Sequence, residues 1–428
     1  MTFHAGSFDG TTFDPATFDG MWSAIEPIGR EASTGGYRRF AWSRADMTLR
    51  EWFAGAAAER GLDLVTDLAG NQWAWWGDPD AAVAAGRRGV VIGSHLDSVP
   101  DGGAFDGPLG VVSALAVVDA LRAGGFTPSR PIAVVNFIDE EGARFGIACA
   151  GSRLITGRLD ADKARGLRDS DGVTMAEAMT AAGQAAERVG PDRETLRRVG
   201  TFVELHVEQG RGLIDLGRPV AVGSGIWPHG RWRLDLDGEA NHAGTTRLED
   251  RRDPMLALAT TVMAARAAAA THGCVATVGK VRVEPNGVNA IPSRVTAWLD
   301  ARGPGEERVR AVVESVAVAV AAAAAAVAGL GQGEPALGST AVEESWTPET
   351  VFDEPLAQRL SRLLDDAPLL DTGAGHDAGI LTSAGVSSAM LFVRNPTGIS
   401  HSPAEFAERE DCHRGVEALV AVTQELAR

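Results

Sequence analysis

Cysteine is scarce in this sequence of 428 residues, which has three cysteines, at positions 149, 274 and 412. So few and so widely separated thiols exclude a disulfide framework, and they lack the paired spacing of a cysteine-based zinc site. This usage fits a reducing compartment, and we expect a cytoplasmic protein. The first residues agree with this expectation, because a basic stretch followed by an apolar core, typical of a signal peptide, is missing there.

Positive charge and long apolar runs are also in short supply. The chain has 40 Lys and Arg residues against 57 Asp and Glu residues, a formal net charge of −17. This balance argues against a nucleic-acid partner, because contacts to phosphates need clustered Lys and Arg. The most apolar stretch, Val309–Leu330, is rich in alanine and contains Arg310 and Glu314, which favours a long helix of a globular protein over a membrane span.

Two apolar strand patterns flank a helical pattern in the first half of the chain. The segments are GVVIGSHLD from Gly89, PLGVVSALAVVDALRAGG from Pro108 and PIAVVNFIDEEG from Pro131. Continuous β-branched runs indicate strands buried on both faces, and a strand–helix–strand order predicts a parallel sheet. Ligands of such sheets bind at the carboxyl ends of the strands, where the polar residues of these segments lie.

The pattern changes after Gly217. The segment RWRLDLDGEA alternates apolar and polar residues, which is typical of a half-exposed antiparallel strand. The following segments predict the order β-α-β-β-α-β of a ferredoxin-like arrangement. We therefore predict an α/β protein with a mainly parallel-sheet catalytic domain, residues 1–217 and 347–428, and an inserted α+β domain, residues 218–346.

Three of the nine histidines end or follow predicted strands of the first domain: His95, His206 and His401. A single histidine of this kind is more often structural. Three that converge on one sheet edge with carboxylates favour a metal centre. Imidazole and carboxylate donors suit Zn²⁺, Mn²⁺, Co²⁺ or Ni²⁺.

Four acids stand near these histidines. Two metal ions about 3.5–4 Å apart need a bridging carboxylate, and Asp106 is the candidate, although helix capping or turn formation would also explain it. In the adjacent pair Glu140–Glu141, one acid can bind metal while the other acts as a general base, the alternative being a solvated acidic turn. Asp97, two residues after His95, could orient that imidazole, or it could be a surface acid.

An ordered set of motifs carries a resemblance to a known family. The motifs are GSHLDSVPDGGAFDGPLGV, DEEGARFG, ELHVEQG, NHAGTT, RRDPM, GVNAIPSRVTAWLDAR, GAGHDA and GISHSPAEF. Together they resemble the N-carbamoyl-L-amino-acid hydrolases and allantoate amidohydrolases, binuclear metal amidohydrolases of the aminoacylase and carboxypeptidase superfamily. The motifs run in order through about residues 90–410, which is most of the chain.

The resemblance implies a role for each motif residue. One divalent ion would be held by His95, Asp106 and His206, and a second by Asp106, Glu141 and His401. Glu140 would be the base that activates a metal-bridging water and carries the proton to the leaving nitrogen.

The resemblance also implies substrate contacts and a partner subunit. The inserted domain would be a lid and a dimerisation surface, and His242 would stabilise the oxyanion in the active site of the other subunit of a homodimer. Asn289 and Arg302 would hold the substrate carboxylate, and Gln209 would bond the ureido group. His376 would support the site or contact the substrate.

Two segments depart from the family pattern. Trp227 and His229 stand where many relatives have smaller residues, so they could alter dimer packing or the pocket. Arg394, close to His401 in the sequence, could meet a second polar portion of the substrate. Ordinary packing would explain these residues equally well.

The sequence thus predicts a metal-dependent amidohydrolase that cleaves the terminal ureido C–N bond of a small carboxylic acid. The candidate substrates are allantoate, which the lid motif slightly favours, and an N-carbamoyl-L-amino acid. A dipeptidase or aminoacylase of the same superfamily is an alternative. A non-catalytic binding protein is disfavoured, because all five ligand positions and Glu140 are present.

Overall fold

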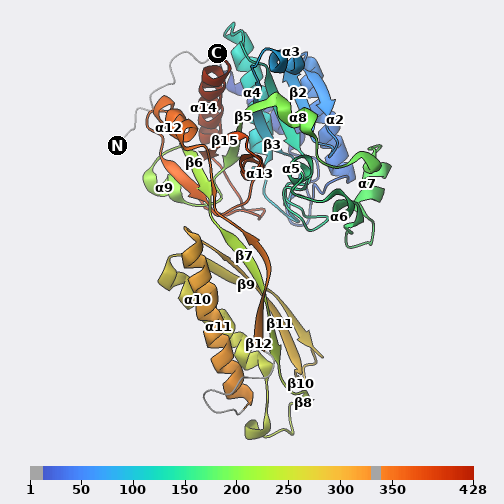
Figure 1. Ribbon diagram of the computed structural model, residues 1–428, viewed down its shortest axis with the longest axis vertical. Helices are drawn as coiled ribbons and strands as arrows, with labels where there is room; N and C mark the ends of the chain where they lie inside the picture. Colours follow the sequence, from blue (N-terminus) through green and yellow to red (C-terminus); the bar gives the residue numbers. More distant parts are fainter. Residues whose placement is uncertain (1–12, 329–338) are drawn as a thin grey trace. The chain divides into compact units, whose positions relative to one another are not determined.

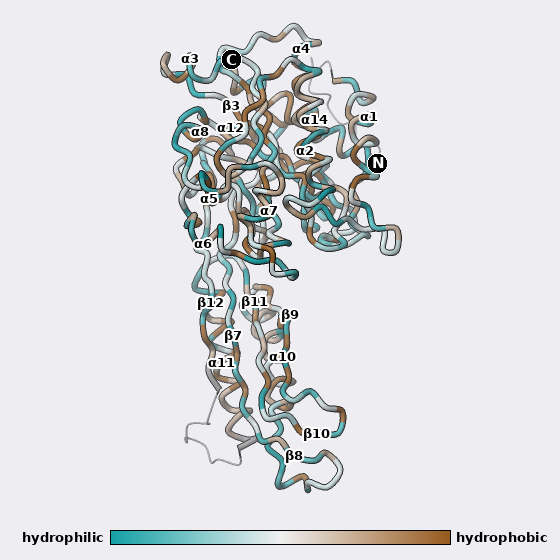
Figure 2. The backbone as a smooth tube through the Cα atoms, turned by 90° about the vertical axis from the view of Figure 1, so that its right-hand side faces the viewer, coloured by the Kyte–Doolittle hydropathy of each residue, from teal (hydrophilic) through white to brown (hydrophobic). Residues whose placement is uncertain are grey.

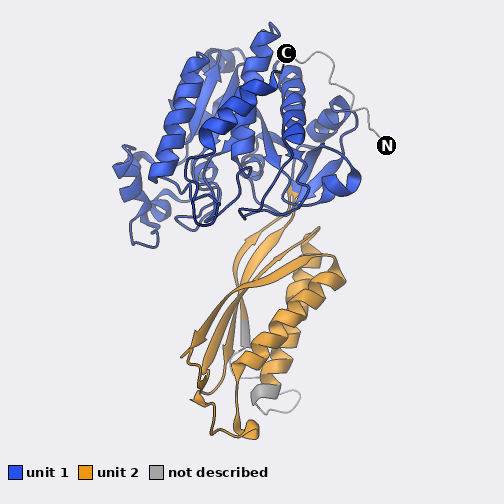
Figure 3. Ribbon diagram, turned by 180° about the vertical axis from the view of Figure 1, so that it is seen from behind, with its two compact units in different colours: residues 1–225, 351–428 blue, residues 226–350 orange. Residues whose placement is uncertain are grey.

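The structure is a computed structural model that describes residues 13–328 and 339–428 (Figure 1). The chain divides into two compact units: unit 1 comprises Met1–Gly225 and Val351–Arg428, and unit 2 comprises Ile226–Thr350 (Figure 3). The first residues, used above to judge a signal peptide, and the end of the helix expected to reach Leu330 lie outside the described residues.

Unit 2 begins later than the insertion expected from residue 218. The reason is strand β6 (Val220–Ile226), which pairs with β15 (Ser387–Val393) in the sheet of unit 1. At the other boundary, β13 (Thr350–Val351) lies beside β6 in the same sheet. The change to alternating hydrophobicity after Gly217 therefore marks an antiparallel strand of unit 1 before it marks unit 2.

Unit 1 contains a nine-stranded sheet in the order β1-β2-β4-β3-β5-β15-β6-β13, with β14 paired to β6. Its remaining strands are β1 (Asp63–Thr66), β2 (Gln72–Trp76), β3 (Gly89–His95), β4 (Ile132–Phe137), β5 (Val199–Val207) and β14 (Leu369–Thr372). The four central strands β4, β3, β5 and β15 are parallel, whereas β1, β2 and β6 are antiparallel to their neighbours. The predicted mainly parallel core is confirmed.

Helices cover both faces of this sheet. They are α1 (Pro15–Ile25), α2 (Arg44–Glu59), α3 (Pro79–Ala84), α4 (Pro108–Ala123), α5 (Ala150–Ile155), α6 (Ala161–Gly166), α7 (Met175–Ala181), η1 (Ala186–Arg188), α8 (Arg193–Arg198), α9 (Gly212–Leu216), α12 (Glu354–Leu363), α13 (Asp377–Ser383) and α14 (Arg409–Ala427). One face packs against α1, α2, α4, α12 and α14 in a single hydrophobic core. Helices α8 and α13 contact strand β5.

Helix α4 follows β3 and is the most deeply buried helix of this core. Pro108 stands at its first turn, where the missing N–H costs nothing, and Gly124 follows its last residue. From Pro108 to Leu121 only Asp119 is not buried, which explains its nearly unbroken apolar sequence (Figure 2). Each fully buried Val or Leu contributes about 1.5–3 kcal/mol, so α4 anchors the loop that precedes it.

Unit 2 has a four-stranded antiparallel sheet with two long helices. Its elements are β7 (His229–Asp237), β8 (Asn241–His242), η2 (Leu248–Asp250), α10 (Pro254–His272), β9 (Val275–Glu284), β10 (Ala290–Ile291), β11 (Arg294–Arg302), α11 (Glu306–Ala328) and β12 (Ser339–Thr347). The sheet order β12-β7-β11-β9 is that of a ferredoxin-like fold. Helices α10 and α11 lie against the sheet and enclose a core with Trp232, Leu234 and Val295.

One helix among the described residues, α10, is long and apolar enough to cross a membrane by length and composition alone. Ala257, Leu258 and Ala265 of this helix pack into the core of unit 2. The core helix of a globular domain has the same composition, so the helix is explained without a membrane.

The burial of α4 gives a prediction about stability. Leu115→Ala should lower the free energy of unfolding of the metal-free protein by about 2–5 kcal/mol, because Leu115 is fully buried and its truncation leaves a cavity. Leu216→Ala is the matched control, since Leu216 is 54% exposed. Urea denaturation followed by circular dichroism measures both, and equal effects of the two substitutions would contradict the packing of α4.

Candidate metal centre

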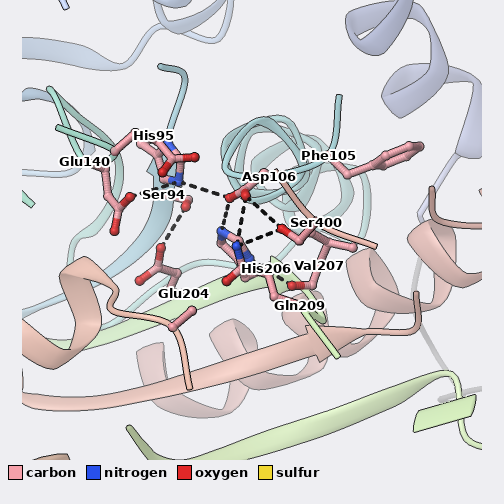
Figure 4. A network of polar contacts seen from close by, with 12 residues as sticks. Ser94, His95, Phe105, Asp106, Glu140, Glu204, His206, Val207, Gln209 and Ser400 are labelled. Atoms are coloured by element: carbon pink, nitrogen blue, oxygen red, sulfur yellow. Dashed lines mark hydrogen bonds and ion pairs between the residues drawn. The ribbon is translucent and has the colours of Figure 1, made fainter. Parts of the chain in front are cut away.

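The predicted ligands come together at the carboxyl ends of the central strands of unit 1. His95 is the last residue of β3, His206 lies near the end of β5, and Glu140 and Glu141 follow β4. His401 follows β15 in a loop. Because β4, β3, β5 and β15 are parallel neighbours, their ends meet at one edge of the sheet. Figure 4 shows His95, Asp106, Glu140 and His206 close together.

Asp106 reaches this edge from the loop between β3 and α4. Gly107, the residue before α4, has φ +87, and a Cβ atom there would lie 2.3 Å from Cε1 of His95. A larger residue would therefore both strain the backbone and collide with the imidazole. The glycine lets the loop fold back so that the Asp106 carboxylate lies beside the histidines.

The two oxygens of Asp106 face different donors. Oδ1 lies 3.1 Å from Nε2 of His206 and 3.8 Å from Nε2 of His95. Oδ2 lies 3.4 Å from Nε2 of His401, which is 3.6 Å from Oε2 of Glu141. Two groups suited to a metal ion, His95–Asp106–His206 and Asp106–Glu141–His401, thus share Asp106.

Unpartnered buried atoms test whether these residues fit metal ions. Nε2 of His95, Nε2 of His206 and Oε1 of Glu141 are buried and have no hydrogen-bond partner among the described residues. An unpaired buried polar atom is costly, and cations in the two groups would satisfy all three atoms. The mixture of imidazole and carboxylate donors also suits a divalent transition metal, so the residues fit such ions.

A third group, Glu204–His206–His376, is also close enough to hold an ion. However, Nδ1 of His206 lies 2.9 Å from the Val207 carbonyl oxygen, where it must donate a hydrogen. Only Nε2 of His206 then has a lone pair to offer an ion, and Nε2 faces Asp106 of the first group. Glu204 in turn accepts hydrogen bonds from Ser94 (2.7 Å) and the Ala378 amide (3.1 Å), so this third group competes with the first and is not an independent site.

Burial and neighbouring charges shift the pKa values strongly. Burial would raise the pKa of Asp106, but the adjacent imidazoles of His206 and His401 hold it well below its usual value. The bond to Asp106 raises the pKa of His401 to about 9. Burial raises the pKa of Glu140 well above its ordinary value, and it raises that of Glu141 to about 7. These shifts show how strongly the ionisable groups of the cluster act on one another.

Asp97 supports two of these loops. Its carboxylate accepts the backbone N–H groups of Glu140 (3.2 Å) and Glu141 (3.0 Å), and it lies 3.3 Å from Nδ1 of His95. Asp97 is 2% exposed, so the surface-acid alternative is wrong. A single buried carboxylate thereby orients one histidine and fixes the acidic pair.

Two polar side chains at the cluster have buried nitrogen or oxygen atoms without a hydrogen-bond partner among the described residues. The Gln209 amide donates to Oδ2 of Asp106 (2.9 Å) and to Ser400 (3.1 Å), while its buried Oε1 has no partner among the described residues. His376 is 3% exposed, both its ring nitrogens lack partners there, and its ring packs edge-on against His206 at 4.5 Å. These unpaired atoms are suited to bind a polar ligand.

The sequence did not single out two buried residues beside the cluster. Sγ of Cys149 lies 3.2 Å from Oε1 of Glu140. Glu405 accepts the backbone N–H groups of Phe105 and Asp106. For Glu405 a signal existed in GISHSPAEF, since the acid closely follows His401. Nothing in the sequence around Cys149 indicates its contact.

Unit 2 carries the other predicted residues. His242 and Asn289 are exposed neighbours, because β8 pairs with β10 and the Asn289 carbonyl accepts the Ala243 amide (2.9 Å). Arg302, at the end of β11, donates to both oxygens of Asp300 at 2.7 and 3.0 Å. The guanidinium therefore already binds one carboxylate in the geometry expected for a substrate.

The residues that depart from the family pattern have structural contacts. Arg394 donates to both oxygens of Asp411 at 2.8 and 2.9 Å, which neutralises its charge. This ion pair is the ordinary packing contact offered above as the alternative, and a role of Arg394 toward the substrate stays a prediction. Nδ1 of His229 lies 3.2 Å from the carbonyl oxygen of Trp227, a local contact at the start of β7.

Comparisons with known proteins agree with this site. The profile of peptidase family M20/M25/M40 matches residues 91–425. The N-carbamoyl-L-amino acid amidohydrolase of Geobacillus stearothermophilus is 36% identical over 425 residues, which cover 95% of this chain and 98% of that protein. The allantoate amidohydrolase of Escherichia coli (strain K12) is 30% identical over 403 residues, covering 92% of this chain and 93% of that protein.

A solved structure is similar over the whole fold. The crystal structure of a hydantoinase/carbamoylase family amidase from Burkholderia ambifaria has a TM-score of 0.81 and 30% identity, covering 97% of this chain and 98% of that chain. Fold and site thus define a metal-dependent hydrolase. The chain belongs to peptidase family M20/M25/M40, as an amidohydrolase of that family, which confirms the resemblance stated from the motifs.

The shared carboxylate gives a prediction about metal content. Apoprotein titrated with Mn²⁺ should bind two ions per chain, and Asp106→Ala should lose both, because Asp106 belongs to both groups. His401→Ala should lose only one. Asp101→Ala is the control, since Asp101 lies in the same loop but bonds Arg38 and Thr34. Calorimetry gives the stoichiometry, and two ions in Asp106→Ala would contradict the shared ligand.

Proposed function

We propose that this protein hydrolyses the terminal ureido C–N bond of a small carboxylic acid, using two divalent ions. One observation carries the proposal: the two oxygens of the buried Asp106 face two separate donor groups. His95 and His206 would complete one group, and Glu141 and His401 the other. Zn²⁺, Mn²⁺, Co²⁺ or Ni²⁺ suits these donors, and such ions lower the pKa of bound water and polarise a carbonyl group.

Glu140 is the candidate general base. Its Oε2 lies 3.7 Å from Nε2 of His95, and it is 5% exposed. Burial raises the pKa of its carboxyl well above the ordinary value, which makes the carboxylate a stronger base. In the reaction Glu140 takes a proton from the attacking water and delivers it to the leaving nitrogen. Asp97 keeps Glu140 in place through its backbone N–H.

The substrate class follows from the polar groups around the site. Oε1 of Gln209 can accept a ureido N–H, and a ring nitrogen of His376 can contact the ureido group. Arg302 and Asn289 would bind the substrate carboxylate, in which case the substrate replaces or joins Asp300 at the guanidinium. Water then converts an N-carbamoyl-L-amino acid to the amino acid, ammonia and CO₂. From allantoate it releases ammonia and CO₂ and leaves the amine that carries the second ureido group.

We also propose that unit 2 forms a lid and a homodimer interface, with His242 serving the active site of the partner subunit. Helix α10 exposes Leu256 and Met263, which are 63% and 71% exposed, and β9 is an edge strand with exposed Val275 and Val281. An apolar helix face beside an open strand edge suits burial against a second copy.

A cytoplasmic location completes the proposal. All three cysteines are free thiols, which suits a reducing compartment. The substrates are small, so neither nucleic acid nor a membrane is needed as a partner.

Ammonia release tests the reaction. The Mn²⁺-loaded protein should release ammonia from N-carbamoyl-L-amino acids, from allantoate or from both. It should cleave acetylated amino acids and dipeptides more slowly, as measured by the amino acid that each sets free. Glu140→Gln should lower kcat by about 10²–10⁴-fold, because the base is lost, while metal content stays unchanged. Glu141→Gln is the contrasting variant, since it should lose metal. No ammonia from either ureido substrate would contradict the function.

Mixing inactive variants tests the partner histidine. Glu140→Gln and His242→Ala homodimers should each be nearly inactive. After subunit exchange, one site of each heterodimer regains both wild-type residues, so roughly a quarter of wild-type activity should return in a random mixture. Mixing Glu140→Gln with Glu141→Gln is the control. It should regain no activity, because each change disables the active site of the subunit that carries it. Equal results from the two mixtures would contradict a role in trans.

A further inference from the structure

Glu405 is a buried acid of unit 1 that the proposed reaction does not use. It is 5% exposed, and its Oε1 accepts the backbone N–H groups of Phe105 (2.9 Å) and Asp106 (3.0 Å). These partners are 300 and 299 residues away in the sequence. The acid thus joins the loop that carries Asp106 to the loop that carries His401.

Gly103 shows how closely the two loops approach. A Cβ atom at this position would lie 2.3 Å from Oε1 of Glu405 and 2.4 Å from its Cβ and Cδ. The Glu405 side chain therefore fills the space that a residue other than glycine would need. The backbone of residues 103–106 therefore contacts the Glu405 carboxylate directly, at Gly103 by close packing and at residues 105 and 106 by hydrogen bonds.

The second oxygen of Glu405 makes a separate contact. Oε2 lies 3.3 Å from Oγ of Ser400, and the same hydroxyl lies 3.3 Å from Oδ2 of Asp106. One hydroxyl has one proton, so it can donate to only one of the two carboxylates at a time. Ser400 therefore lies between two acids that repel each other, and the two backbone N–H groups keep Glu405 in place.

We propose that Glu405 is a positioning residue that sets the place of the shared ligand Asp106 relative to His401. The proposal rests on the proposed function, in which Asp106 binds both ions. A second acid beside a shared carboxylate costs free energy by repulsion. Its presence is explained by the two hydrogen bonds that fix the backbone at Phe105 and Asp106, because a ligand held in advance binds metal more tightly.

Metal affinity of three variants tests the proposal. Glu405→Ala should weaken binding of at least one Mn²⁺ by about 10–100-fold, the usual effect of losing a group that orients a ligand. Glu405→Gln should stay close to wild type, because an amide oxygen can accept both N–H groups. Glu410→Gln is the control for lost charge, since Glu410 is an exposed acid of the same segment. Calorimetry on the apoproteins measures affinity, and thermal unfolding of the same apoproteins measures folding.

The outcomes separate the two proposals. If wild type binds two ions and folded Glu405→Ala binds them with unchanged affinity, the positioning role is wrong and the metal centre stands. If Glu405→Gln is as weak as Glu405→Ala, charge rather than hydrogen bonding matters, and the role is again wrong. If wild type does not bind two ions, both proposals are wrong.

A second variant covers the case in which Glu405→Ala does not fold. Gly103→Ala leaves Glu405 intact but forces its carboxylate away from the loop, so it should weaken Mn²⁺ binding by a similar factor. A folded Gly103→Ala protein with wild-type affinity would overturn the positioning role.

Discussion

Repulsion between buried acids is the constraint on which the rest of unit 1 depends. Asp97, Asp106, Glu140 and Glu141 meet at one edge of the sheet, and three of them are at most 5% exposed. Carboxylates this close cannot all be ionised in a dry environment unless positive charge lies among them. Bound cations would supply that charge, held in part by the histidines at the strand ends. Their convergence requires the parallel order β4-β3-β5-β15.

The loops are held in place by acids that are not themselves suited to bind the ions. Asp97 fixes the backbone of Glu140 and Glu141, and Glu405 fixes that of Asp106. In each case a carboxylate accepts backbone N–H groups from a distant segment. The arrangement is rigid because the hydrogen bonds act on the main chain, whose position determines where the ligand side chains can reach.

Much of the fold and site could be predicted from local patterns. Buried β-branched runs identified β3 and β4. The ligand loop from His95 to Asp106 could be predicted because its strand, glycines and helix follow one another directly in the sequence. The motif GISHSPAEF placed Glu405 close to His401, but its role was not predictable, because that role depends on contacts with residues some 300 positions away. The ion pair of Arg394 was also not predicted, because no pattern in the sequence shows that Asp411, 17 residues further on in α14, faces its guanidinium. The boundary near residue 218 was misplaced because an antiparallel edge strand of unit 1 alternates in the same way as strands of unit 2.

The insertion of unit 2 between β6 and β13 has an evolutionary consequence. The chain passes between the units only at residues 225–226 and 350–351, so the sheet edge with the histidines is complete without the inserted segment. Under the proposed function, Asn289 and Arg302 select the acid while unit 1 breaks the bond. Mutations in the insertion can then change which carboxylic acids bind as substrates without disturbing the hydrolytic centre. A family built in this way can diverge in substrate while keeping one reaction.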